Sequence, residues 1–113
     1  MSRDLRLYLE DIRDHCGEIA EHVRGLTYEE FVSDRRTYKS VVFSLIVIGE
    51  AAKHVPEEVR SRHPEVEWRR IAGLRNVIAH GYFALRDPVL WEIVTEKLPA
   101  LREQVEQMLA ELS

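Results

Sequence analysis

The sequence has a single cysteine, no long apolar run and no apolar leader, and each absence excludes a class of protein. Cys16 has no second cysteine with which to form an internal disulfide, and it falls on the apolar stripe of its segment, which favours a buried thiol. The longest apolar run, VVFSLIVIG at 41–49, is about half the ~20 residues that a membrane-spanning helix needs. The first residues are charged, so no secretion signal is indicated. We therefore expect a cytoplasmic protein that has no membrane partner.

The sequence also lacks the short motifs of several enzyme classes. Four of its histidines, His15, His22, His54 and His63, show neither HExxH spacing nor the Cys-His spacing of zinc sites. There is no glycine-rich phosphate loop, and no serine or cysteine stands out as a nucleophile. We expect that the protein uses neither a metal nor a cofactor.

The charge is acidic overall but uneven along the chain. The formal net charge is −4 over 113 residues, which argues against a protein that coats nucleic acid indiscriminately. Residues 60–80 hold five arginines and two glutamates, a balance of +3, so the remainder carries −7. A local site for an anion is therefore compatible with the acidic average.

Apolar residues recur at the spacing of helices, and no strand-like alternation is present. The pattern predicts a helix up to Gly25, a short helix begun by a Thr27–Glu30 capping box, and a buried central helix at 35–54 capped by Asp34. Further helices are predicted from Pro56 to His63, at 67–80, and from Asp87 onward, the last kinked or split at Pro99. We expect a single domain over residues 1–113, folded as an all-α bundle of four to six helices.

One stretch of the sequence, LRNVIAHGYF at 74–83, places an arginine on the apolar face of the helix predicted at 67–80. Arg75 cannot lose its proton, so it needs a partner or an anion. Glu50, the only carboxylate within 41–52, is a candidate partner that itself needs a donor.

Two interpretations of this stretch remain open on physical grounds. In the first, Arg75 forms a buried ion pair with Glu50, and His80 only caps its helix. In the second, Arg75, Asn76 and His80 surround an anionic phosphodiester. The arginine then contacts the nonbridging oxygens and the histidine moves a proton.

The pattern Arg75-Asn76-x3-His80-x-Tyr82 resembles the Rx4HxY signature of the HEPN superfamily, in particular of its HepT-like ribonuclease toxins. Two further blocks support the resemblance, in the expected order. LIVIGEAAKHV at 45–55 resembles that family's central helix with its glutamate, here Glu50, and WEIVTEKLPAL at 91–101 resembles its last helix. The resemblance therefore covers most of the chain.

The resemblance implies a HEPN-like bundle that forms a homodimer or a higher assembly of dimers, with Arg75 and His80 of both protomers in one cleft. Family members of this type cleave RNA without a metal, through attack of the 2′-hydroxyl on the adjacent phosphate, and act as toxins of type VII-like toxin-antitoxin systems. A twofold axis supplies two histidines, one as base and one as acid. The alternative is a noncatalytic HEPN module that binds a nucleotide or a partner protein in the same cleft.

Tyr82 has two roles that can hold together. As an aromatic residue just past a helix end, it can pack against the last helix, for example against Trp91. The resemblance implies that a nucleotidyltransferase (MntA-like) antitoxin adds AMP to this tyrosine. The added phosphate charge and adenosine bulk would keep RNA out of the cleft.

Overall fold

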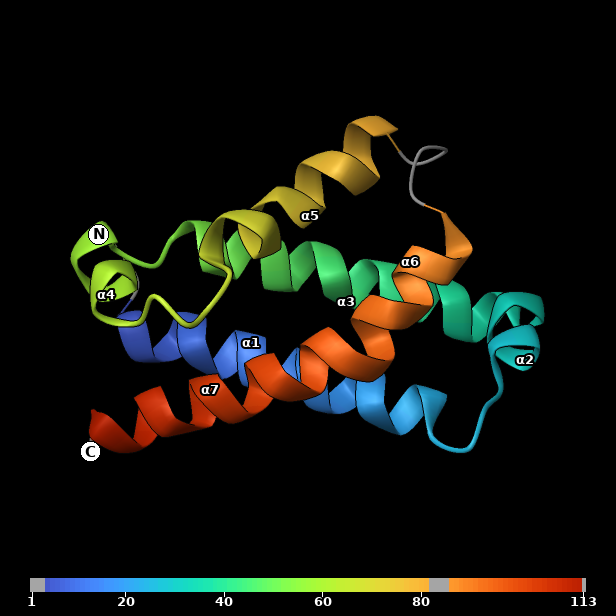
Figure 1. The fold of residues 1–113 in the computed structure, drawn as a ribbon, viewed down its shortest axis with the longest axis horizontal. Coiled ribbons are helices and arrows are strands. Elements are labelled where there is room, and N and C mark those ends of the chain that lie inside the picture. The colour runs from blue at the N-terminus through green and yellow to red at the C-terminus, as the bar shows by residue number, and fades with distance from the viewer. Residues whose placement is uncertain (1–3, 82–85, 113) are drawn as a thin grey trace.

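The structure, a computed structural model, describes residues 4–81 and 86–112, without the side chains of residues 79–81. All regular elements in these ranges are helical, and no strand occurs among them. They are α1 (Leu5–Val23), α2 (Tyr28–Ser33), α3 (Arg35–Lys53), α4 (Glu57–Arg62), α5 (Trp68–Gly81), α6 (Asp87–Glu92), the π-helical segment η2 (Ile93–Lys97) and α7 (Leu98–Glu111). Because α6, η2 and α7 follow one another without a break, the described residues form six continuous helical segments. The predicted all-α bundle is confirmed (Figure 1).

The long helices pack in the order α5, α3, α1 and α7 (Figure 1). Leu45 and Ile48 of α3 are fully buried, as are Leu9 and Ile12 of α1, so the core lies between these two helices and α7. α3 is central, as its apolar sequence predicted, but it is not buried on every side, because Phe43 is 62% exposed. α5 packs chiefly on α3, which leaves much of its surface uncovered by the described bundle.

Most helix ends follow the local signals in the sequence. Gly25 has a φ of 77°, a left-handed conformation that glycine adopts without strain, and it follows the end of α1. Thr27 and Glu30 form the predicted capping box of α2, and the side chain of Asp34 accepts from the Thr37 N–H at the start of α3. Pro56 lies one position earlier than expected: it is the N-cap of α4 rather than its first residue, because its backbone is extended.

The last helix is kinked near Pro99, one of the two predicted outcomes, and it is not interrupted (Figure 1). The π-helical segment η2 ends two residues before this proline, and the Leu98 N–H donates to the Ile93 carbonyl, five residues back. Proline has no N–H to continue the α-helical pattern, and its ring crowds the preceding turn. Figure 1 shows that α6 descends steeply and that α7 then runs in a different direction along α1.

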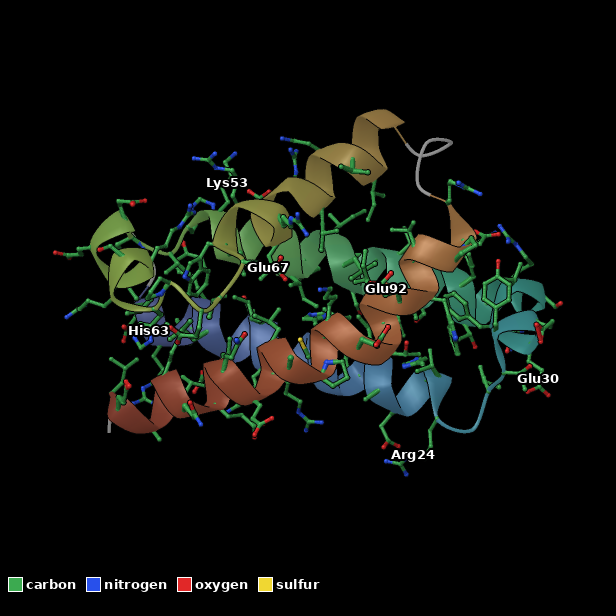
Figure 2. The ribbon with its side chains drawn as sticks, viewed as in Figure 1. Arg24, Glu30, Lys53, His63, Glu67 and Glu92 are labelled. Atoms are coloured by element: carbon green, nitrogen blue, oxygen red, sulfur yellow. The ribbon has the colours of Figure 1, made fainter. Side chains whose placement is uncertain are left out.

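The surface of the described bundle is strongly charged. Figure 2 shows the side chains of Arg24 and Glu30 projecting away from the helices, and both residues are exposed. Within residues 4–81 and 86–112, no helix is both long enough and apolar enough to cross a membrane.

Candidate functional site

The site begins at a close crossing of α3 and α5. A Cβ atom added to Gly49 of α3 would lie 3.0 Å from the Ile71 carbonyl oxygen and 3.1 Å from the Arg75 backbone nitrogen of α5. Real side chains rarely come so near to backbone atoms, so the crossing at this distance requires glycine. The next residue of α3 is Glu50, and the crossing therefore brings Glu50 and Arg75 together.

Arg75 and Glu50 form an ion pair, with Arg75 Nε 3.0 Å from Glu50 Oε2. The first interpretation predicted this ion pair, and the pair is present. The prediction that the pair is buried is wrong, because the two side chains are 44% and 42% exposed. Glu50 Oε2 is itself shielded from water, yet it accepts no well-aligned hydrogen bond from the described residues. The pair leaves the guanidinium partly open to solvent, because α5 lies at the edge of the bundle.

The second carboxylate oxygen of Glu50 contacts His54, at the C-terminal end of α3. His54 Nε2 lies 3.4 Å from Glu50 Oε1, one helical turn further on. The His54 ring stacks on the Tyr8 ring of α1, with ring centroids 5.1 Å apart and ring planes 14° from parallel. A chain of four contacting side chains, Tyr8, His54, Glu50 and Arg75, therefore links α1, α3 and α5.

These four residues border a pocket of about 350 Å³. Its other lining residues are Asp11, Ile46, Val47 and Ala51. The sequence reasoning identified neither Tyr8 nor His54 as a site residue. The signal available for His54 was its position four residues after Glu50 on the same helix face, whereas no local pattern pointed to Tyr8.

The other predicted site residues lie further along α5. Asn76 is exposed, and its Oδ1 lies 3.5 Å from Arg75 Nη1, a long contact. Residue 80 belongs to α5 and follows Asn76 by four positions, so both lie on one face of the helix. The side chain of His80 and the whole of Tyr82 lie outside the described residues. The structure thus brings together Glu50, Arg75 and Asn76.

Within residues 60–80, fewer arginines are available to bind an anion than the composition suggested. Arg60 donates hydrogen bonds to the Ala52 and Lys53 carbonyls and so caps the end of α3. Arg70 lies 3.3 Å from Glu67. Arg69 has no ion-pair partner among the described residues, and it lies seven positions before Asn76 on the same face of α5. It is a basic residue that the sequence reasoning did not single out.

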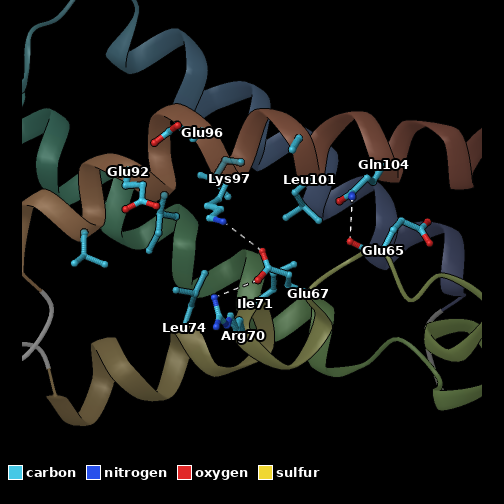
Figure 3. A pocket seen from close by; sticks show the side chains of 14 residues that line it. Glu65, Glu67, Arg70, Ile71, Leu74, Glu92, Glu96, Lys97, Leu101 and Gln104 are labelled. Carbon is cyan, nitrogen blue, oxygen red and sulfur yellow. Dashed lines mark hydrogen bonds and ion pairs between the residues drawn. The ribbon is translucent and has the colours of Figure 1, made fainter.

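A second hollow, a groove of about 550 Å³, lies between α5 and the last helix (Figure 3). Its floor includes Ile71, Leu74 and Leu101, and its charged lining residues are four glutamates, Arg70 and Lys97. Glu67 lies 3.8 Å from Lys97 Nζ and also contacts Arg70, so both cations are already partnered (Figure 3). The excess of carboxylates repels phosphate. Although this groove is larger than the pocket beside Arg75, it is therefore a poor candidate for an anionic ligand.

No group of three histidine, cysteine, aspartate or glutamate side chains within the described ranges is arranged to hold a metal ion. Cys16 is buried, and burial raises the pKa of its thiol to about 12 while Arg102 partly opposes the shift. The thiol therefore stays protonated at neutral pH, as expected for a cysteine that serves packing.

Comparison with known proteins points to one family. The family model described as "Ribonuclease HepT-like" matches residues 12–108. A protein of Caldanaerobacter subterraneus subsp. tengcongensis named "Putative RNase TTE0752" is 39% identical over 104 residues, which are 92% of this chain and 93% of the relative. "Probable ribonuclease HepT" of Thermococcus cleftensis is 37% identical over 108 residues, 96% of this chain and 98% of the relative. No solved structure matches the chain.

Proposed function

Since this chain belongs to the HepT-like ribonuclease family, we propose that it is an endoribonuclease, the toxin of a type VII-like toxin-antitoxin system, that cleaves RNA without a metal. The observation that carries the proposal is the position of Arg75. Its guanidinium is oriented by Glu50 and yet is 44% exposed at the uncovered edge of the bundle. A phosphate can reach a guanidinium held in this way without first opening the core.

The proposed reaction needs a base, an acid and a group that stabilises negative charge. The base removes the proton of a 2′-hydroxyl, the 2′-oxygen bonds to the adjacent phosphorus, the bond from phosphorus to the 5′-oxygen breaks, and the acid gives that oxygen a proton. We assign the proton transfers to His80. Arg75 contacts the nonbridging oxygens and stabilises the charge that develops on them, with Asn76 and Glu50 in supporting roles.

One histidine cannot easily serve as base and acid in the same step, so we propose that two copies of His80 meet across a homodimer axis. The exposed face of α5 supports this arrangement. Arg69, Asn76 and Val77 are all exposed there, and Val77 is an apolar side chain 42% exposed. A helix that packs chiefly on α3 and shows such a face to solvent is suited to a partner copy.

The proposed regulation of RNA cleavage acts at Tyr82. We propose that a nucleotidyltransferase antitoxin transfers AMP from ATP to the hydroxyl of Tyr82, which loses its proton, while pyrophosphate leaves; Tyr82 lies two residues after His80 in the sequence. The new phosphodiester would carry a negative charge near the residues that bind the RNA phosphate, and the adenosine would occupy space in the cleft.

The experiment that tests the proposal measures RNA cleavage by the purified protein and by His80→Ala. The wild type should cleave RNA and His80→Ala should not, while His22→Ala, which changes an exposed histidine at the far end of α1, should retain activity. RNA binding without cleavage by the wild type would instead support the noncatalytic module.

Mixed dimers test the two-histidine site directly. Wild type and His80→Ala should be co-expressed with different tags in known ratios. If each site needs both histidines, activity should follow the square of the wild-type fraction. A linear dependence, or an active monomer in light scattering, would contradict the composite site.

A further inference from the structure

We propose that the pocket bordered by Tyr8, His54 and Arg75 is a subsite for one base of the RNA substrate. The proposal rests on the proposed function, because it assumes that Arg75 contacts an RNA phosphate. It adds two residues from α1 and α3, Tyr8 and His54, as the surface on which the base next to that phosphate stacks.

The paired rings of Tyr8 and His54 offer a surface for stacking. Tyr8 and His54 lie nearly parallel, with centroids 5.1 Å apart, and the His54 side chain is 48% exposed. Proteins that bind single-stranded RNA stack bases on such aromatic rings, and a preformed stack has little side-chain freedom left to lose. The rings lie at the C-terminal end of α3, where His54 follows the last helical residue, Lys53.

The lining of the pocket suits a base better than a phosphate. Ile46, Val47 and Ala51 give it apolar walls, and a volume of about 350 Å³ is enough for a flat heterocycle. Asp11 and Glu50 also line it, so a phosphate inside the pocket would be repelled. A base carries no such charge. The pocket therefore suits the base of a nucleotide, and the phosphate belongs at Arg75.

Glu50 links the proposed phosphate position to the proposed base position. Glu50 contacts Arg75 Nε through one oxygen, at 3.0 Å, and His54 Nε2 through the other, at 3.4 Å. One carboxylate group thus separates the guanidinium from the imidazole. The two groups are close neighbours, and we infer that the phosphate and the base of one nucleotide can reach both of them.

The experiment combines protein variants with abasic RNA. A 2′-fluoro RNA oligonucleotide, which has no 2′-hydroxyl to attack the phosphate, is bound to the protein and followed by fluorescence anisotropy. A set of oligonucleotides carries one abasic residue at each position in turn. At one position, loss of the base should weaken binding to wild type by roughly tenfold, the effect of one lost stacking contact.

In His54→Ala, loss of the base at that RNA position should no longer weaken binding. This variant should bind the intact RNA roughly tenfold more weakly than wild type, and the abasic residue at the sensitive position should then change its affinity less than about twofold. His22→Ala, another exposed histidine, should keep the full abasic effect. A merely structural role for the ring stack would not produce this coupling at one RNA position.

Three results would overturn the subsite. The first is that an abasic residue weakens RNA binding to His54→Ala as much as it weakens binding to wild type. The second is that no abasic position changes the affinity of wild type. The third is a free mononucleotide, AMP or GMP, that binds wild type and not His54→Ala while RNA affinity is the same for both. Cleavage of natural RNA that depends on His80 would still support the proposed function in each case, so the two proposals can fail separately.

Discussion

Gly49 and Arg75 approach each other so closely that a Cβ atom at residue 49 would lie 3.1 Å from the Arg75 backbone nitrogen. The same added atom would meet the Ile71 carbonyl at 3.0 Å, and neither backbone atom can turn away as a side chain can. We therefore expect Gly49→Ala to push α5 away from α3, with a loss of about 1–3 kcal/mol in the free energy of unfolding. Thermal or urea unfolding measures this loss.

Gly73 is the matched control for Gly49→Ala. It lies on the same helix as Arg75, and apart from the backbone of that helix a Cβ atom there meets no described atom within 4 Å. Gly73→Ala should therefore stabilise the protein by about 0.5–1 kcal/mol, because alanine loses less backbone entropy in a helix. Equal effects of the two substitutions would show that the crossing does not depend on Gly49.

Arg75→Ala should separate catalysis from stability. Loss of a well-placed donor to the transition state should lower the cleavage rate on the order of 10²–10³-fold. The ion pair with Glu50 is more than two-fifths exposed, so the free energy of unfolding should change by less than about 1 kcal/mol. Arg75→Lys should also be slow, because lysine keeps the charge and loses the planar fork.

Arg70→Ala is the control for Arg75→Ala. It removes another ion-paired arginine of the same helix, on the side of the acidic groove, and it should leave the cleavage rate nearly unchanged. If Arg75→Ala unfolds the protein instead of inactivating a folded one, the purely structural interpretation of Arg75 is favoured.

Cleavage should persist in EDTA, since the proposed mechanism uses only histidine and arginine side chains. The measurement is the rate of RNA cleavage after dialysis against the chelator, with and without added Mg²⁺. A strict need for Mg²⁺ in the bond-breaking step, with RNA binding unchanged, would contradict the proposed chemistry.

Tyr82→Phe should remain active on RNA but escape the antitoxin, because phenylalanine offers no hydroxyl for AMP. Co-expression with the proposed nucleotidyltransferase antitoxin, followed by intact-mass spectrometry and peptide mapping, should show one AMP on the wild type and none on the variant. The other tyrosines, Tyr8, Tyr28 and Tyr38, serve as internal controls. An AMP that maps to one of them would defeat the assignment.

Cys16 should make stability depend on pH in the alkaline range. The unfolded thiol loses its proton near its ordinary pKa of 9.0, whereas burial raises the pKa in the folded protein to about 12. The folded state therefore binds more protons between these values, and its stability falls as pH rises through this window. Above pH 9.0, the free energy of unfolding of the wild type should fall relative to that of Cys16→Ala. A constant difference up to pH 11 would contradict it.

Most helix boundaries could be predicted from the sequence, because capping is a local interaction. Thr27 and Glu30 are three residues apart and satisfy each other's backbone groups, and Gly25 ends α1 through its own backbone conformation. Likewise, the spacing of Arg75, Asn76 and residue 80 fixes their relation within one helix. These relations span less than a few turns of chain, so the residues themselves determine them.

Tertiary structure decided how the helices meet, and through that the character of the site. The sequence suggested Glu50 as a partner of Arg75 but not the exposure of the pair, which depends on α5 lying at the edge of the bundle. It gave no sign that Arg60 would cap α3 or that Tyr8 would stack on His54, residues 46 positions apart. Such contacts depend on the positions of whole helices, which are set by the packing of many side chains at once.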